Sequence, residues 1–310
     1  MPKKAARKPK KAKPRSRAPA KKAAAPPRAR PARAAAPVLR PVPLYEFIAG
    51  DLIGYVRLSD PERGIEFSRA QSGKTLPGPS KEVLSLRHYL ASGQGGLLVP
   101  REEAACKGKI EKQGLAFRYD KVRDWPLTAT AQYELLSEGG VDAAFQFSFS
   151  HKLNGFEAGV ETFMSRARPA VYLHCEGRWQ RAVPGPHVQR FYARNQQVAE
   201  LIADGRWNGL RMAGIALARE PQGYDYPVVI LRDELTRWAL TYMGLTEQCS
   251  SVWVNGAHRT IGFGLIGADV KANSKLTCRL RVLLCRAEKL DDVLPYYRSF
   301  VQEARTSRKR

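Results

Sequence analysis

The fold class is decided by the stretch Val141-Asp-Ala-Ala-Phe-Gln-Phe-Ser-Phe-Ser-His151, which continues as Lys-Leu-Asn-Gly and then Phe156-Glu-Ala-Gly-Val-Glu-Thr-Phe-Met164. Phe145, Phe147 and Phe149 alternate with polar residues, and this period of two is typical of a strand with one apolar and one polar face. Turn residues at 152–155 precede a second alternation that begins at Phe156. The stretch therefore predicts a half-buried antiparallel hairpin.

Most of the remaining chain shows the same strand-like pattern, with turn residues at regular intervals. Two helices are predicted, at residues 188–204 and 290–304, while residues 80–92 fit either a helix or a strand. Residues 102–113 and 265–275 are predicted to be loops. These patterns favour a mostly β fold: an antiparallel β-sandwich or supersandwich with two to three peripheral helices and a disordered basic N-terminal tail.

The N-terminal segment is set apart by its charge. Residues 1–40 hold fifteen of the 52 Lys and Arg residues and no Asp or Glu, so they carry more than half of the net charge of +23. Such a Lys/Ala/Pro-rich segment has little to bury and is expected to be disordered. It could bind DNA, RNA or another polyanion without reading its sequence, through Lys3, Lys4, Arg7, Lys8, Lys10 and Lys11. A solubilising tail, or a start codon placed too far upstream, explains the same composition.

Several classes of protein are excluded by what the sequence lacks. The chain has no apolar run of transmembrane length and no secretory signal, so a cytoplasmic protein without a membrane partner is expected. Five widely spaced cysteines and five isolated histidines predict neither a disulfide framework nor a metal site. Residues 72–75 read Ser-Gly-Lys-Thr, but Ser68 stands where a phosphate-binding loop needs glycine and Pro77 disfavours the required helix. No cofactor is predicted.

Three segments of the second half carry a resemblance to a known group of proteins. They are residues 156–164 (FEAGVETFM), Arg190 with the later Gly205-Arg206-Trp207, and residues 267–273 (GADVKAN). Over roughly residues 140–286 the chain resembles uncharacterised bacterial proteins with a galactose-mutarotase-like β-supersandwich. The resemblance implies a sugar-binding concave sheet, on which true mutarotases use a Glu base and a His acid. Their catalytic motifs are not matched here residue by residue, so the resemblance does not carry that activity over.

Candidate catalytic residues follow from the faces of two predicted strands. Glu157 and Glu161 share one strand face, and His174 shares another with Glu176. If these faces meet, one site holds the carboxylates and imidazole that acid/base chemistry on a sugar ring needs. An ordinary solvent-exposed face would show the same pattern.

The candidate ligand-binding residues are Glu176, Arg190, Arg194 and Trp179. Arg190 and Arg194 stand one turn apart on the predicted helix and could clamp an anion, while Trp179 could stack on a sugar ring.

The sequence thus predicts a carbohydrate-binding β-sandwich in residues 41–304, followed by a basic end at 305–310. Whether it is an enzyme of the epimerase, lyase or hydrolase type is left open, as are the sugar and the oligomeric state. The alternative is a nucleic-acid-associated protein that binds DNA or RNA through residues 1–40.

Overall fold

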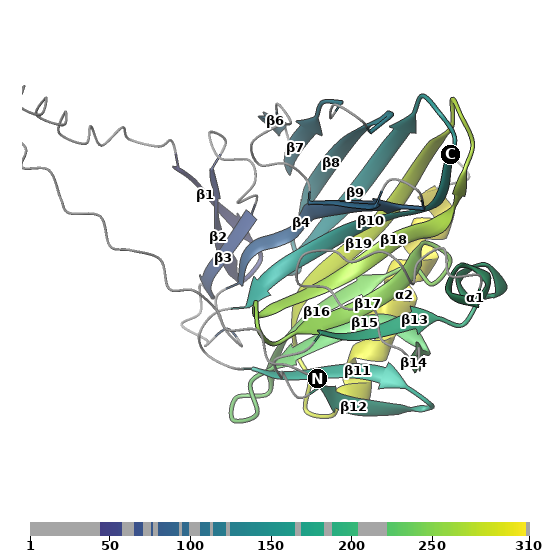
Figure 1. Ribbon diagram of the computed structural model, residues 1–310. Helices are drawn as coiled ribbons and strands as arrows, with labels where there is room; N and C mark the ends of the chain where they lie inside the picture. The colour runs from purple at the N-terminus through teal and green to yellow at the C-terminus, as the bar shows by residue number, and fades with distance from the viewer. Residues whose placement is uncertain are drawn as a thin grey trace, which may run out of the picture. The chain divides into compact units, whose positions relative to one another are not determined.

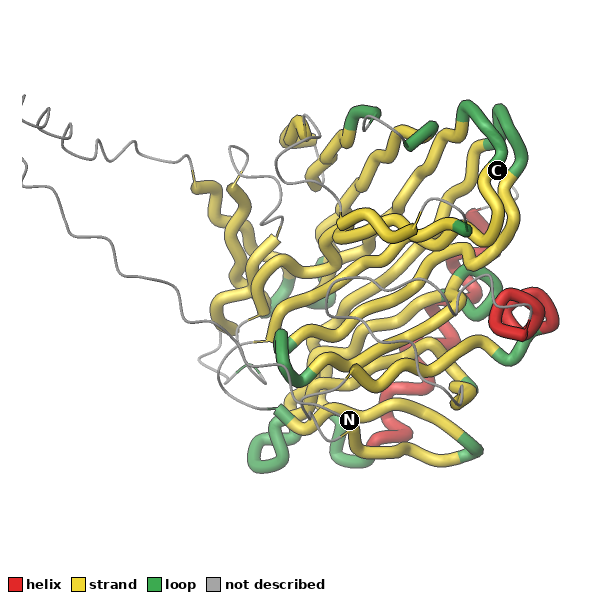
Figure 2. Tube along the Cα trace, viewed as in Figure 1, coloured by secondary structure: helices red, strands yellow, loops and turns green. Residues whose placement is uncertain are grey.

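The computed structural model describes 44–57, 65–70, 76, 80–92, 95–98, 106–111, 114–121, 125–164, 169–182, 188–203 and 222–307. Within these residues two large, predominantly antiparallel β-sheets pack face to face (Figures 1 and 2). The predicted fold class, a mostly β sandwich with few helices, is confirmed. The basic tail, including Lys3 to Lys11, lies outside the described residues, so its disorder and the boundary near residue 41 stay predictions.

The first sheet has ten strands in the described part of the chain, ordered β1-β2-β3-β4-β10-β18-β17-β13-β14, with β5 also paired to β4. All pairs are antiparallel except β13–β14. The strands are β1 (Leu44–Ala49), β2 (Leu52–Arg57), β3 (Ile65–Ala70), β4 (Ser80–Ala91), β5 (Gly95–Leu98), β10 (Leu153–Met164), β13 (Val188–Ala193), β14 (Gln222–Tyr224), β17 (Cys249–Asn255) and β18 (Thr260–Val270).

The second sheet has nine described strands in the order β12-β11-β15-β16-β19-β9-β8-β7-β6. These strands are β6 (Cys106–Glu111), β7 (Gly114–Tyr119), β8 (Leu127–Leu136), β9 (Gly140–Phe149), β11 (Ala170–Cys175), β12 (Arg178–Ala182), β15 (Tyr226–Arg232), β16 (Trp238–Gly244) and β19 (Lys275–Arg286). The segments predicted as loops at 102–113 and 265–275 contribute β6 and the end of β18, because pairing with β7 and β10 overrides their local preference.

The predicted hairpin at 141–164 is wrong in one respect: its two strands do not pair with each other. β9 pairs with β8 and β19 in the second sheet, whereas β10 pairs with β4 and β18 in the first. The turn at 150–152 therefore carries the chain from one sheet to the other. The two phenylalanine faces meet across the core, where the rings of Phe149 and Phe156 lie 4.9 Å apart and edge to face.

The predicted helix at 188–204 is wrong over its first half. Residues 188–193 form β13, which pairs with β17, and only Gln196–Ala203 form the helix α1. Asn195 caps the start of this helix: its side-chain oxygen accepts a hydrogen bond from the backbone N–H of Val198 at 2.8 Å. Residues 80–92, which fitted either structure, form the long strand β4.

The outer face of the nine-stranded sheet is covered by the C-terminal helix. A 3₁₀ turn (Leu290–Val293) leads into α2 (Leu294–Ser307), which confirms the predicted C-terminal helix within three residues. Val293, Tyr297 and Phe300 pack there on apolar residues of β15, β16 and β19. Neither described α-helix is long and apolar enough to cross a membrane.

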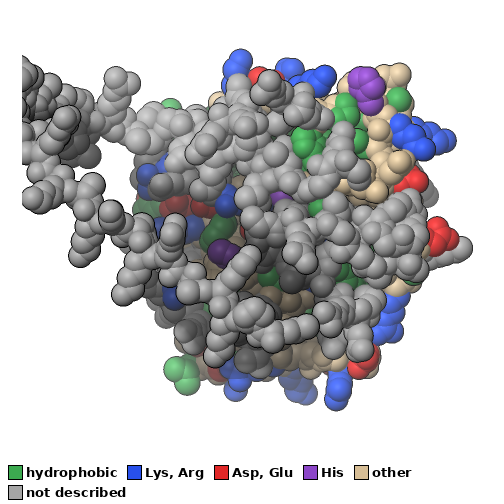
Figure 3. Space-filling view, in the orientation of Figure 1, with side chains coloured by type: hydrophobic (Ala, Val, Ile, Leu, Met, Phe, Trp, Pro, Cys, Tyr) green, Lys and Arg blue, Asp and Glu red, His purple; other side chains and the backbone are tan. Residues whose placement is uncertain are grey.

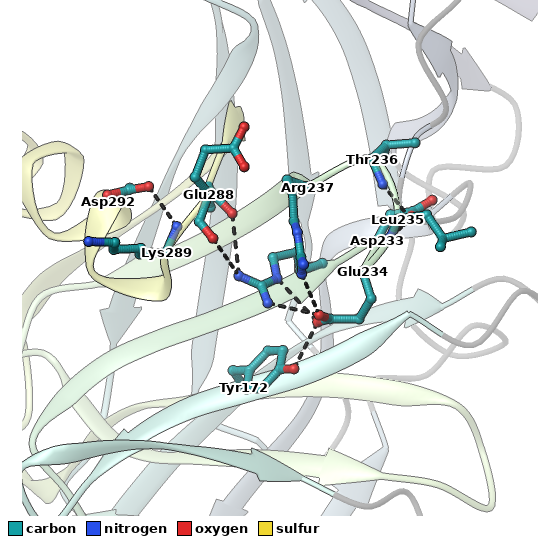
Figure 4. Close-up of polar contacts among 11 residues, drawn as sticks. Tyr172, Asp233, Glu234, Leu235, Thr236, Arg237, Glu288, Lys289 and Asp292 are labelled. Atoms are coloured by element: carbon teal, nitrogen blue, oxygen red, sulfur yellow. Dashed lines mark hydrogen bonds and ion pairs between the residues drawn. The ribbon is translucent and has the colours of Figure 1, made fainter.

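A polar network fixes the turn between β15 and β16 (Figure 4). The carboxylate of Glu234 accepts hydrogen bonds from Arg232, Arg237 and the hydroxyl of Tyr172, each at 2.8 Å for its shortest contact. The Arg232 hydrogen bond, helped by Tyr172 and by the arginine charges, outweighs partial burial and lowers the pKa of Glu234 to about 2. The network therefore anchors this turn to β11 through an ionised carboxylate.

Candidate functional site

A buried ion pair lies on the outer face of the ten-stranded sheet, the face that points away from the core. Glu157 of β10 is completely buried and accepts a hydrogen bond from Arg190 of β13, although β18 and β17 lie between these strands. The hydroxyls of Ser250 and Ser251 donate to the second oxygen of Glu157 at 2.6 and 3.0 Å. Every oxygen of this buried carboxylate is thereby paired, as a charge removed from water requires.

Two glycines make room for this arrangement. A Cβ atom on Gly264 would overlap the Glu157 carboxylate, and one on Gly159 would overlap the imidazole of His88. Gly159 and Gly264 are directly paired across β10 and β18. The absence of two neighbouring side chains thus creates the space that the carboxylate and the imidazole fill.

The protonation state of Glu157 follows from its partners. Burial is the largest single effect and would raise the pKa of this carboxyl, but the Arg190 charge, the nearby His88 ring and the Ser250 hydroxyl together outweigh it. The pKa of Glu157 falls to about 2 as a result. Glu157 is therefore a fixed negative charge at neutral pH and not a proton donor.

The imidazole of His88 lies beside this ion pair. Its Nε2 atom is 4.0 Å from the carboxylate of Glu157, and its ring centre is 5.5 Å from that of Trp253. The side chain is only 1% exposed, yet neither ring nitrogen has a hydrogen-bond partner in the described part of the chain. Because buried polar atoms are normally satisfied, His88 is a candidate for contact with a ligand or a water.

The second carboxylate of this face is more open. Glu161 accepts a hydrogen bond from the indole Nε1 of Trp253 at 3.2 Å, and the guanidinium of Arg87 lies 4.0 Å away. Arg87 also binds Glu82 at 2.8 Å. The Glu161 side chain is 12% exposed and that of Arg87 is 21% exposed, so solvent reaches this end of the face. Figure 3 views this side of the molecule, where acidic, basic and histidine side chains gather beside apolar ones.

The structure does not bring His174 to Glu161. His174 lies on β11 in the other sheet, and its Nδ1 atom contacts Asp225 at 2.9 Å. Arg194 contacts the other oxygen of Asp225 at 3.5 Å, and the ring of Trp179 meets that of His174 at 4.9 Å. The predicted residues therefore sort into two groups, one on the outer face of the ten-stranded sheet and one around Asp225.

The first group is Glu157, Glu161 and Arg190, and the second is His174, Trp179 and Arg194. Glu176 follows β11 in a turn with a positive φ of 55° and does not continue the strand face of His174. Arg190 and Arg194 do not stand on one helix, because Arg190 lies on β13 and Arg194 lies between β13 and α1. The anion clamp predicted from their helical spacing is not formed.

His88 was missed by the sequence analysis because of an irregularity in β4. A simple alternation puts His88 on the same face as Leu84 and Leu86. The register shifts between the pairs His88–Gly159 and Leu86–Val160, and Arg87 is the extra residue. Such a bulge turns the residues on its two sides to different faces, and no signal in the sequence marks its position.

Comparison with known proteins gives structural matches alone. No protein-family model and no curated protein matches the sequence. The α-N-acetylgalactosaminidase NagBb from Bifidobacterium bifidum, in its GalNAc complex, aligns with 84% of this chain at a TM-score of 0.51 and 10% identity. This chain spans 39% of the length of NagBb. The alignment shows that the two-sheet β-sandwich fold of this chain recurs in part of NagBb.

Two epimerase structures also align with this chain, over most of their own length. The galactose 1-epimerase from Lactobacillus acidophilus NCFM is covered over 94% of its chain, at 9% identity and a TM-score of 0.40. The GalM/aldose epimerase homologue from C. elegans is covered over 99%, at 5% identity and a TM-score of 0.39. These alignments cover 78% and 79% of the present chain.

Proposed function

We propose that this protein binds a carbohydrate on the outer face of the ten-stranded sheet, next to Glu161. The observation that carries the proposal is that two carboxylates on one strand face differ in their exposure to solvent. Glu157 is locked into a buried ion pair, whereas Glu161, four residues later on β10, keeps partial contact with solvent. A partly open carboxylate can accept hydrogen bonds from ligand hydroxyls, which are the groups that distinguish one sugar from another.

The residues around Glu161 have separable roles in this proposal. The indole of Trp253 is 1% exposed, so it orients Glu161 through its N–H and does not stack on the ligand. The Glu157–Arg190 pair holds the floor of the site rigid, because both side chains are almost fully buried. His88 supplies two ring nitrogens that have no hydrogen-bond partner among the described residues.

If the protein also acts on its sugar, proton transfer falls to Glu161 and His88. The pKa of about 2 keeps Glu157 ionised, so Glu157 cannot give a proton to a ring or leaving-group oxygen near neutral pH. Epimerase, lyase and hydrolase reactions all need one group that takes a proton and one that gives it. The likeness of fold to carbohydrate-active enzymes supports the substrate class and not the reaction.

The test uses protection against thermal unfolding, since a ligand stabilises a protein by binding its folded state. A panel of neutral sugars is screened by melting shift on the wild type, on Glu161→Gln and on His174→Asn. We expect the shift to vanish in Glu161→Gln and to persist in His174→Asn, the matched control on the other sheet. A wild type that no sugar protects, or a shift that survives in Glu161→Gln, contradicts the proposal.

A further inference from the structure

A second cleft lies on the opposite side of the sandwich from Glu161. It has a volume of about 620 Å³ and opens between the C-terminal half of α2, the start of β15 and the turn that follows β16. This volume is in the range of pockets that hold one small ligand. Its wall includes Tyr226, Arg298, Gln302 and Arg305.

Tyr226 provides a flat apolar surface at the edge of the cleft. The residue is 36% exposed, and its ring centre lies 5.0 Å from that of His174 and 5.5 Å from that of Tyr297. His174 is in turn fixed by Asp225, and the hydroxyl of Tyr297 lies 3.0 Å from that of Thr246. The orientation of Tyr226 is thus set before any ligand arrives, which lowers the entropy lost on stacking.

The charges of the cleft are not equally compensated. Asp225 already binds His174, Arg194 and the backbone N–H of Gly177. Among the described residues no ion pair involves Arg298 or Arg305, and both side chains are exposed. These arginines are seven positions apart on α2, so they share one face of the helix about 10 Å apart. Glu247 also lines the cleft and makes an interaction of its own. The cleft therefore presents two guanidinium groups that have no ion-pair partner among the described residues, beside an aromatic ring.

We propose that this cleft binds a sugar ring that carries an anionic group, either a carboxylate or a phosphate. The ring stacks on Tyr226, and the anion takes hydrogen bonds from Arg298 or Arg305, whose planar guanidinium groups match both anions. Gln302 lies between the two arginines along the helix and can bind ring hydroxyls. This site shares no residue with the face around Glu161, so either site can fail without the other.

The experiment measures binding to the full-length protein by isothermal titration. The probes are glucuronate, glucose 6-phosphate, glucose and inorganic phosphate. The variants are Arg298→Ala, Arg305→Ala, their combination, and Arg178→Ala, an exposed arginine outside the cleft that gives the same change of charge. The variant Tyr226→Leu tests the stacking surface.

We expect glucuronate or glucose 6-phosphate to bind more tightly than both glucose and inorganic phosphate. Whichever of the two sugar anions binds more tightly shows whether the site prefers a carboxylate or a phosphate. Each single arginine variant should weaken that binding by about fivefold, and the double variant by more, whereas Arg178→Ala leaves it unchanged. Tyr226→Leu should weaken the binding of the sugar anion but not the binding of inorganic phosphate. The proposal is overturned if neither sugar anion binds, if inorganic phosphate binds as well as they do, or if the arginine variants match Arg178→Ala.

Discussion

The guanidinium of Arg190 on β13 meets the carboxylate of Glu157 on β10 across two intervening strands, with both side chains almost completely buried. An ion pair in this position constrains four neighbouring strands at once. Its removal therefore has consequences for stability as well as for the candidate site.

Replacing Arg190 by Met should destabilise the protein strongly. The substitution leaves a buried, ionised carboxylate without its counter-charge, and the expected loss is about 3–5 kcal/mol in the free energy of unfolding. Urea unfolding measures this loss. The double variant Arg190→Met with Glu157→Gln should recover part of it, because no bare charge then remains. A loss below about 1 kcal/mol in the single variant would mean that water reaches Glu157.

Replacing Gly159 by Ala should destabilise the protein through a steric clash. The new methyl group would overlap the His88 ring, and overpacking of this kind costs about 1–3 kcal/mol. The matched test is the double variant Gly159→Ala with His88→Ala, in which the obstructing ring is absent. Thermal unfolding should show the double variant to be less destabilised than the sum of the two single changes. Simple additivity would indicate that the ring moves aside freely.

The Glu234 network should make stability depend on pH in acid. The pKa of Glu234 is lowered from 4.5 to about 2 in the folded protein, so folding favours its ionised form. This contribution is fully present above about pH 4.5 and is lost as the pH falls through about 2. Urea unfolding between pH 6 and pH 2 should show a shallower pH dependence for Glu234→Gln than for the wild type. Parallel curves for the two proteins would contradict the prediction.

The composition of the basic tail predicts how the affinity for nucleic acid depends on sequence and on salt. Binding of the full-length protein to DNA should be indifferent to sequence and should weaken steeply as salt rises, because counterion release drives it. A variant that lacks residues 1–40 should lose most of this affinity, as fluorescence anisotropy can measure. Binding that selects a sequence, or that persists without the tail, would require a reader elsewhere in the chain.

The sequence predicted the faces of the strands better than their partners. The alternation around Phe145 and Phe156 gives the core-facing side of two strands, but a period of two says nothing about which strand lies alongside. The first half of the predicted helix was wrong because Arg190 lies on a strand that pairs with β17, where its partner is the distant residue Trp253. No local pattern contains that information.

The predicted site residues show the same limit: relationships within one strand were predicted, whereas relationships between strands were not. Glu157 and Glu161 were correctly assigned to one strand face, since a single strand determines that relationship. The position of His174 depended on which sheet receives β11, and that of His88 on a bulge in β4. Both are decided by tertiary pairing, which overrides local preference.

The crossing turn at 150–152 has a consequence for how the chain assembles. The residues before it form one flank of each sheet, β1–β5 and β6–β9, and the residues after it form the other flank of each. The two halves are joined along the ladders between β4 and β10 and between β19 and β9. Neither sheet can be completed by one half alone, so both seams must close together. During synthesis, the edges of β4 and β9 therefore stay unpaired until their partners β10 and β19 have been made.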